Sequence, residues 1–338
     1  MNFLKYSINN NNHKNLGIEI LRMILCLWVI TFHFAGMKNK LKYKILKTFF
    51  HVPTFMLISF YFTYNTFISN DIIKYKKRLE RLVVPYIIWP IIVLAISNSS
   101  YDSINIKKLI FELLLQYITG YKIYVILWFV ASLIFFEIFF KIIHILFNKQ
   151  SLLILKILSI ISYLMQYEEI NYNIFYLYPE YMLGVSRIIE MMPIAVTGLV
   201  LKNIDIFKTI KNDKKKYISF SMIILFFIYN YNVFGNFKGF GYNGIKSNIA
   251  GICLFISFSL IPFNKIKNKT IISFITTITK YTGGIYYLQG IIGIRIVKYK
   301  YFKERRFYMA FMIYILDYLI CSIFIKIFRN NKLKYLFY

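Results

Sequence analysis

Three ionisable residues share one side of an apolar segment near the N-terminus. The segment is Leu16–Gly36, and it contains Glu19, Arg22 and His33. Each helical residue advances about 100° and rises about 1.5 Å, so His33 lies within about 20° of the direction of Arg22 and about 16 Å further along the axis. Glu19, three residues before Arg22, falls on the same face. An imidazole placed in this way can act as a general base near neutral pH.

The row of Glu19, Arg22 and His33 on one helix face, called the ionic stripe below, has two interpretations. An ionisable side chain that faces lipid costs about 3 kcal/mol or more, so such residues in a membrane segment usually mark a functional site. Alternatively, Glu19 and Arg22 form an i,i+3 pair at a helix end, and His33 is a hydrogen-bonded core residue. The spacing alone leaves both open.

A second basic group stands before another apolar run. Arg78 and Arg81 follow three lysines and precede Pro85. Arginine forks suit bidentate binding of phosphate. Basic residues just inside a membrane are also ordinary topology anchors and contact anionic lipid. A phosphate site and a membrane anchor are therefore both compatible with the pattern.

The composition excludes a soluble globular protein. Of 338 residues, 58% are hydrophobic and 20% aromatic, whereas soluble domains contain about 45–50% apolar residues. The net charge of +28 does not indicate nucleic-acid binding, because the basic residues form short runs between long apolar stretches. Cys26, Cys253 and Cys321 lie inside apolar segments without metal-ligand spacing, so we expect neither a metal site nor a disulfide.

A spanning helix needs about 20 mostly apolar residues, and ten segments approach that length. The sequence therefore predicts an all-α, polytopic membrane helix bundle with about ten transmembrane helices. The segments are Leu16–Gly36, Leu46–Ile68, Leu82–Ile96, Ile123–Phe147, Leu152–Tyr167, Val185–Leu201, Tyr217–Phe234, Asn248–Phe263, Ile271–Val297 and Phe307–Ile327.

Several local features qualify this scheme. Ile106–Gly120 is amphipathic and Tyr172–Leu183 is ambiguous, so either is compatible with an interfacial or re-entrant piece. Pro193 is expected to kink the sixth segment. Glu190 stands three residues after Arg187 and can pair with it.

The expected organisation is a single membrane domain. Residues 1–15 form a cytoplasmic N-terminal tail, 16–328 the membrane domain, and 329–338 a cytoplasmic C-terminal tail. The N-terminus lacks a signal-peptide cleavage pattern. The excess of Lys and Arg on the inner side favours cytoplasmic termini in a cell membrane, although the outer loops Lys38–Lys47 and Lys298–Arg306 are also basic. No hydrophilic stretch is long enough to fold as a separate soluble domain.

Four stretches resemble the integral-membrane acyltransferase family 3, whose members acylate polysaccharides and other glycans. Arg22, ten intervening residues and His33 look like its Arg-x10-His signature. Arg78-Leu-Glu-Arg81 is similar to its Arg-x-x-Arg motif. The two remaining stretches are Leu127–Leu133, similar to the family's Leu-Trp-Phe run, and Lys280–Gln289, similar to its late Tyr-Thr-x-Gly-Ile-Tyr run.

The resemblance implies a membrane O-acyltransferase that moves acetyl from cytoplasmic acetyl-CoA to a hydroxyl of a cell-surface or lipid-linked polysaccharide, such as a capsule component. Arg78 and Arg81 would then hold the phosphates of CoA. Arg22, paired with Glu19, would lie at the channel mouth, and His33 would act as general base or transient acyl carrier. The expected partners are the glycan acceptor and membrane lipid, with no nucleic acid and no metal.

The chain departs from the family pattern at two places. The family's Ser-Gly in the second helix reads Ser59-Phe60, and its late His is Gln289. The second departure leaves any role of the late site open.

Two other classes compete with this interpretation. A lipid-linked oligosaccharide flippase also needs buried charge along a path, but a longer chain with detectable halves is then expected. A glycan polymerase usually has a large outer loop, and the predicted outer loops are short.

Overall fold

The computed structural model of the chain describes residues 15–34, 50–97, 106–120, 123–167, 179–205, 207, 210–233, 245–261, 263, 266, 268–297 and 306–338. Within these ranges every regular element is helical and there is no strand. The predicted all-α class is therefore confirmed.

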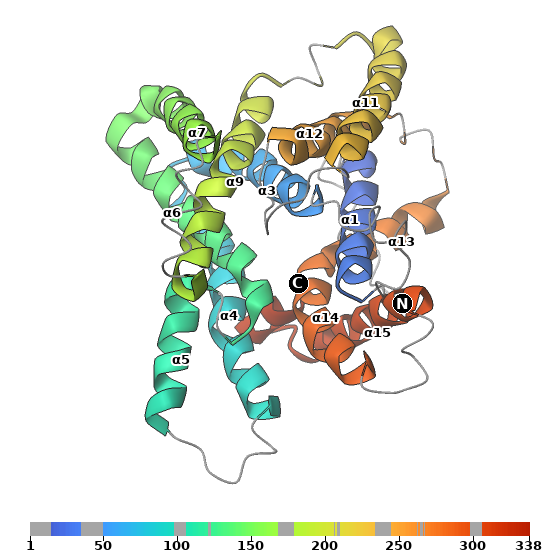
Figure 1. The fold of residues 1–338 in the computed structure, drawn as a ribbon. Coiled ribbons are helices and arrows are strands. Elements are labelled where there is room, and N and C mark those ends of the chain that lie inside the picture. Colours follow the sequence, from blue (N-terminus) through green and yellow to red (C-terminus); the bar gives the residue numbers. More distant parts are fainter. Residues whose placement is uncertain are drawn as a thin grey trace.

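Figure 1 shows how the helices are arranged in the bundle. Twelve α-helices occur in the described ranges: α1 (Leu16–Phe34), α3 (His51–Ile68), α4 (Ile72–Ser97), α5 (Ile106–Thr119), α6 (Trp128–Phe147), α7 (Ser151–Tyr167), α9 (Pro179–Asn203), α11 (Asn212–Val233), α12 (Ile245–Leu260), α13 (Lys269–Lys280), α14 (Thr282–Val297) and α15 (Arg306–Ile327). Three short 3-10 helices also occur in these ranges: η2 (Val125–Leu127), η3 (Asn148–Gln150) and, after α15, η6 (Lys332–Phe337).

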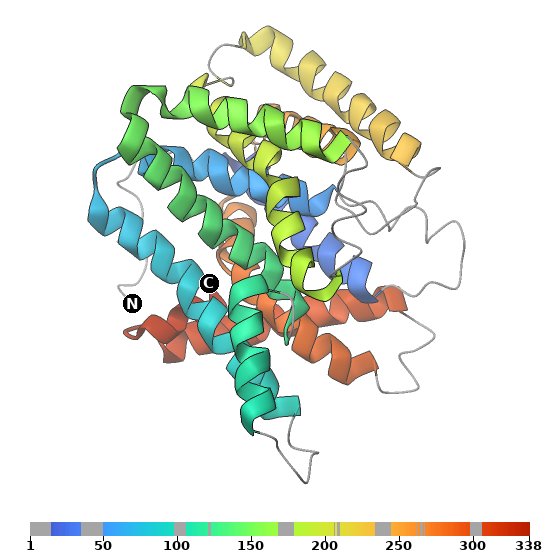
Figure 2. The same cartoon turned by 60° about the vertical axis from the view of Figure 1, so that its left-hand side comes forward.

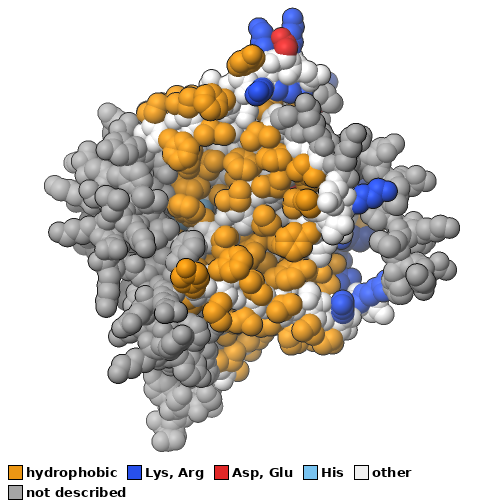
Figure 3. Space-filling view, turned by 90° about the vertical axis from the view of Figure 1, so that its right-hand side faces the viewer, with side chains coloured by type: hydrophobic (Ala, Val, Ile, Leu, Met, Phe, Trp, Pro, Cys, Tyr) orange, Lys and Arg blue, Asp and Glu red, His pale blue; other side chains and the backbone are white. Residues whose placement is uncertain are grey.

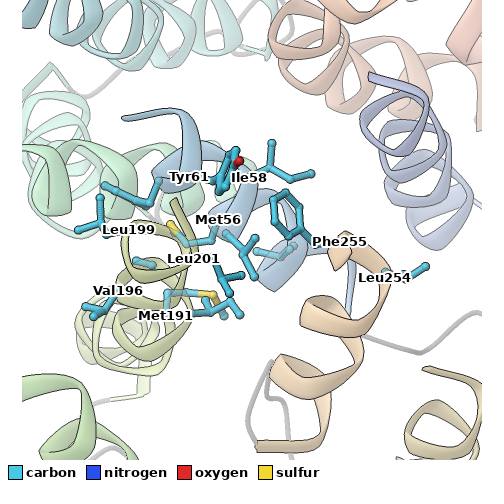
Figure 4. Close-up of a cluster of buried hydrophobic side chains, with 14 of the residues drawn as sticks. Met56, Ile58, Tyr61, Met191, Val196, Leu199, Leu201, Leu254 and Phe255 are labelled. Carbon is cyan, nitrogen blue, oxygen red and sulfur yellow. The ribbon is translucent and has the colours of Figure 1, made fainter. Parts of the chain in front are cut away.

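Two hydrophobic cores hold the bundle together, and α1 belongs to both. In the first core, α3 and α9 pack closely and α12 closes the cluster (Figure 4). The second core forms between α1, α4, α14, α15 and η6. Leu21 and Leu25 of α1 are buried in the first core, whereas Cys26 and Ile30 are buried in the second. The helix that carries the ionic stripe therefore joins the two halves of the packing.

The outer surface is apolar. Figure 3 shows one face covered by hydrophobic side chains, with lysines and arginines gathered at its edges. Large apolar side chains such as Ile72, Ile118 and Ile145 are more than two-thirds exposed. An apolar surface of this extent needs lipid or another protein to cover it.

Four described stretches are long and apolar enough to cross a membrane, namely Leu16–His33, Ile72–Ile96, Trp128–Leu164 and Tyr308–Ile327. Two shorter apolar helices are Leu109–Thr119 and Ser247–Leu260. These findings fit a membrane protein, and the number of ten spans remains a prediction.

The third predicted segment is longer than its apolar run. Helix α4 begins at Ile72, ten residues before Leu82, so the basic group lies within its first turns and not in a connection. The carboxylate of Asp71 accepts the backbone N–H of Lys74 at 3.0 Å and caps this end. Long basic side chains can extend from a helix end towards water, which is why the helix continues through this polar stretch.

The ambiguous segment Ile106–Gly120 is also helical, as α5. In Figure 2 it extends beside the far end of α4, while α11 lies across the opposite end of the bundle. Most of Tyr172–Leu183 lies outside the described residues; its last part begins α9.

The expectation of one continuous helix over Ile271–Val297 is wrong. The helix breaks at Tyr281, and α13 and α14 lie on either side. Thr282 and two glycines follow the break, and glycine is a poor helix former. The backbone N–H of Tyr281 donates to the Ile278 carbonyl at 2.9 Å, whereas the Thr279 carbonyl accepts from outside α13, from the Thr282 hydroxyl at 3.0 Å and from Arg22 of α1 at 3.2 Å.

Pro193 lies inside α9 and removes one backbone donor. The carbonyl that it leaves without that donor belongs to Ile189, four residues earlier. Ser162 of α7 donates its hydroxyl to this carbonyl at 2.6 Å. The proline therefore creates a specific contact between α7 and α9.

The predicted C-terminal tail packs against the bundle. Leu336 and Phe337 are buried, and the ring of Phe337 stacks on Phe324 with centroids 4.8 Å apart. A Cβ atom added to Gly284 of α14 would lie 2.6 Å from the backbone of Phe337. Glycine at this position therefore permits η6 to lie directly on α14.

Gly198 is the corresponding contact in the first core. A Cβ atom there would lie 2.5 Å from the carbonyl oxygen of Leu57 in α3. The two helices therefore touch through their backbones at this point.

We expect Gly198→Val to separate α3 from α9 and to destabilise the protein by about 1–3 kcal/mol, the usual range for overpacking. Thermal unfolding of detergent-extracted protein measures this change. Ala95→Val, at an exposed position of α4, is the control; equal melting temperatures for the two variants would contradict the close packing.

Candidate functional site

Arg22 is anchored by groups from three helices. It donates to the Glu19 carboxylate at 3.2 Å within α1, to the Thr279 carbonyl of α13 at 3.2 Å, and to the Thr282 hydroxyl of α14 at 2.9 Å. Thr279 is among the last residues of α13, so its carbonyl is one of those that the helix break leaves available. The predicted pairing of Glu19 with Arg22 is present.

The anchoring is partly buried. Glu19 is 8% exposed and the Arg22 side chain 29% exposed. A charge-assisted hydrogen bond is stronger in such surroundings than in water. Arg22 is therefore held at the junction of α1, α13 and α14.

His33 lies in the last turn of the same continuous helix, so its position on the face of Arg22 follows from α1 itself. The centroid of its ring is 5.4 Å from that of Phe32, and the Phe32 ring centroid is 5.3 Å from that of His51. The His33 side chain is exposed. The role of His33 therefore stays a prediction.

The late motif brings α14 against α1. The Cys26 thiol lies 3.9 Å from the Thr282 carbonyl. Gln289 stands seven residues after Thr282, two turns along the same face of α14. Gln289 is 1% exposed, and both polar atoms of its side chain lack a hydrogen-bond partner in the described part of the chain.

Asp317 is a buried ionisable residue that the sequence analysis did not identify. It lies in the middle of α15 with 0% exposure, and neither carboxylate oxygen has a hydrogen-bond partner among the described residues. Tyr314, one turn earlier, is also buried without a partner for its hydroxyl there. The signal was present in the sequence, because a single acidic residue inside a 22-residue apolar helix is a functional candidate by default.

Arg78 and Arg81 have different surroundings, although they are three residues apart. Arg78 points inward and donates to Glu137 of α6 at 2.5 Å. Arg81 is exposed, and its guanidinium lies 6.0 Å from the ring centre of Tyr335 in η6. In the described residues no hydrogen bond or ion pair joins either arginine to Arg22 or His33.

The Leu127–Leu133 stretch forms another contact with a buried ion pair. Arg187 of α9 pairs with Glu190 at 2.8 Å, as the spacing predicted, and both side chains are less than 10% exposed. The Arg187 guanidinium lies 5.7 Å from the ring centre of Trp128, within the range of a cation–π interaction. This motif therefore fixes α6 against α9.

The described residues contain no group of three or more His, Cys, Asp or Glu side chains that could hold a metal ion. Cys26, Cys253 and Cys321 are free and buried.

The apolar exterior fits a membrane protein, and Arg22 and His33 lie on one face of its first helix. A family model described as an acyltransferase domain matches residues 15–328. The chain therefore belongs to this acyltransferase family, as the four motifs predicted. No curated protein and no solved structure matches it.

The contact between Arg22 and Thr282 can be tested with an isosteric change. A hydrogen bond to a charged group contributes about 1.5–3 kcal/mol, and about 1.4 kcal/mol corresponds to a tenfold change in rate. We expect Thr282→Val to reduce acyl transfer roughly tenfold at unchanged protein level, because Arg22 loses its shortest contact.

The control is Thr276→Val in α13, whose hydroxyl donates only within its own helix, to Ile272 at 2.9 Å and Ser273 at 3.1 Å. Equal activities of the two variants would show that the Thr282 hydroxyl does not position Arg22.

Proposed function

We propose that the protein transfers an acetyl group from cytoplasmic acetyl-CoA to a hydroxyl group of a cell-surface or lipid-linked polysaccharide. The observation that carries the proposal is the placement of Arg22 and His33 on one face of α1, in a chain that belongs to an acyltransferase family. The anchored Arg22 and the exposed His33 supply a fixed cation and an accessible imidazole about 16 Å apart along the helix.

His33 is the proposed general base. It takes the proton of the acceptor hydroxyl while that oxygen attacks the carbonyl carbon of the thioester. The carbon–sulfur bond then breaks, and the CoA thiolate leaves and takes up the proton. In the alternative route the imidazole itself attacks the thioester, carries the acetyl group, and passes it to the hydroxyl in a second step.

The donor's phosphates are proposed to lie at the basic start of α4. Lys74, Lys76, Lys77 and Arg81 are exposed there. The thioester would then reach His33 along α1, where the separation of Arg22 and His33 is comparable with the length of a pantetheine arm. With both termini in the cytoplasm, the acceptor approaches from the other side of the membrane.

We expect His33→Ala to reduce acetyl transfer at least about 100-fold, because general base catalysis typically contributes about 100- to 10,000-fold. The assay follows label from [14C]acetyl-CoA into cell-envelope glycan, in membranes with matched amounts of each variant. His144→Ala is the control, because His144 lies in the last turn of α6 and its Nδ1 is 3.2 Å from the hydroxyl of Ser151.

Near-normal activity of His33→Ala would remove the assignment of this residue. If wild-type membranes transfer no label while cells still assemble acetylated polymer, a role in lipid-linked oligosaccharide transport takes precedence.

The phosphate assignment makes a separate prediction. Arg81→Gln should raise the KM for acetyl-CoA about three- to tenfold and make it less sensitive to salt, because an exposed charge contributes mainly screened attraction. Steady-state kinetics at low and high ionic strength measure both effects. Arg329→Gln removes another exposed arginine and controls for net charge; an equal rise in KM for both variants would show that Arg81 makes no specific contact.

A further inference from the structure

Glu137 is a buried acidic residue in the middle of α6 that has no place in the proposed chemistry. Its side chain is 2% exposed. One carboxylate oxygen accepts two hydrogen bonds, from Arg78 of α4 at 2.5 Å and from the Thr63 hydroxyl of α3 at 3.0 Å. Glu137 therefore connects three helices at one point.

Burying the ion pair of Arg78 and Glu137 costs desolvation free energy, which apolar side chains in the same place would not cost. Replacing a buried ion pair with well-packed apolar side chains is often neutral or stabilising. Arg78 could also extend towards water, as the exposed Lys74, Lys76 and Lys77 of the same helix do. Instead it turns inward to Glu137. Stability alone does not account for this arrangement.

The contacts hold one edge of the Arg78 guanidinium and leave another open. Nε donates to Glu137, and Nη2 donates to the backbone carbonyl of Ser59 at 3.3 Å and to its hydroxyl at 3.2 Å. Nη1 makes no hydrogen bond within the described part of the chain, and the side chain is 27% exposed. The guanidinium is thus held in one orientation, and Nη1 is left to donate to a group outside these contacts while the side chain stays partly exposed.

A fixed, partly exposed guanidinium suits a phosphate group. The N–H groups of Nη1 can donate charge-assisted hydrogen bonds to phosphate oxygens, and orienting the guanidinium in advance removes an ordering cost from binding. The surrounding side chains of α4 add positive charge, and Arg81 is one turn further along. Ser59, retained where the family has Ser-Gly, serves as a second anchor for the same guanidinium.

We propose that Glu137 is a positioning residue that holds Arg78 so that its Nη1 binds a phosphate of the acyl-CoA donor. This inference rests on the proposed function for the identity of the donor. A lipid headgroup offers the same phosphate chemistry, and the experiment below separates the two sources.

The test compares wild type, Glu137→Gln and Glu190→Gln, each as the full chain in lipid nanodiscs. Glu190→Gln makes the same change at a buried carboxylate whose arginine partner lies on its own helix, α9. Glu137→Gln should raise the KM for acetyl-CoA about tenfold and change kcat less than threefold. Glu190→Gln should leave this KM unchanged. A fall in kcat with unchanged KM in Glu137→Gln would indicate a structural role only and would overturn the proposal.

Two further comparisons identify the ligand group. S-acetylpantetheine has no phosphate, so wild type and Glu137→Gln should use it equally well; a tenfold difference with this donor as well would overturn the phosphate assignment. In the double variant Arg78→Gln/Glu137→Gln the second change should add no further effect on KM, because a positioning residue acts only through its partner. Independent, additive effects would contradict the mechanism.

Equilibrium binding of radiolabelled CoA separates failure of this inference from failure of the proposed function. If wild type binds CoA without transferring acetyl, the proposed function is wrong, and weaker binding by Glu137→Gln still supports the inference. If wild type binds no CoA, or if the variant changes only the response to anionic lipid in the nanodisc, the donor is not the ligand and the inference is overturned.

Discussion

The interaction on which the site depends is the anchoring of Arg22. A guanidinium inside an apolar bundle must find acceptors, because an unpaired charge in such surroundings is costly. Glu19 supplies one acceptor from the same helix, and the broken helix between α13 and α14 supplies two more. The break at Tyr281 is therefore part of the site: an unbroken helix would use the Thr279 carbonyl for its own hydrogen bonding. Through Arg22 the position of α1 is tied to that of α14.

The connection between α1 and α14 extends to the basic start of α4, where we propose that the donor binds. The two glycines after the break let η6 lie against α14, where a side chain on Gly284 would meet Phe337. The same short segment contacts the start of α4 through the ion pair of Lys332 with Glu80 at 2.9 Å. Arg22 and the basic turns of α4 are thus linked through one packed segment. Because packed interiors deform little, the distance between the proposed phosphate end and the proposed reacting end is fixed by the fold.

The features that could be predicted from the sequence are those that depend on the local pattern of residues. Apolar length gave the helices, and the spacing of Glu19, Arg22 and His33 placed them on one face, which the continuous α1 confirms. It did not predict the break at Tyr281, since an apolar run that contains glycines is compatible with one helix or two. Nor did it predict that α4 extends through its basic turns, because hydropathy cannot distinguish a polar connection from a helix end with long basic side chains. Asp317 was detectable by its charge, whereas its lack of a partner in the described residues appears only in three dimensions.

The ion pairs of the bundle show why a functional site is harder to predict from the sequence than a fold. Glu19 with Arg22, and Arg187 with Glu190, are separated by three residues, so helical geometry alone brings them together. Arg78 and Glu137 are 59 residues apart and meet only because α3, α4 and α6 pack at one point. A local pair forms whenever its helix forms and therefore says little about the rest of the molecule. A long-range pair has to be maintained by the packing of several helices. The orientation that this pair gives to a partly exposed arginine is therefore the stronger indication that the arrangement serves binding.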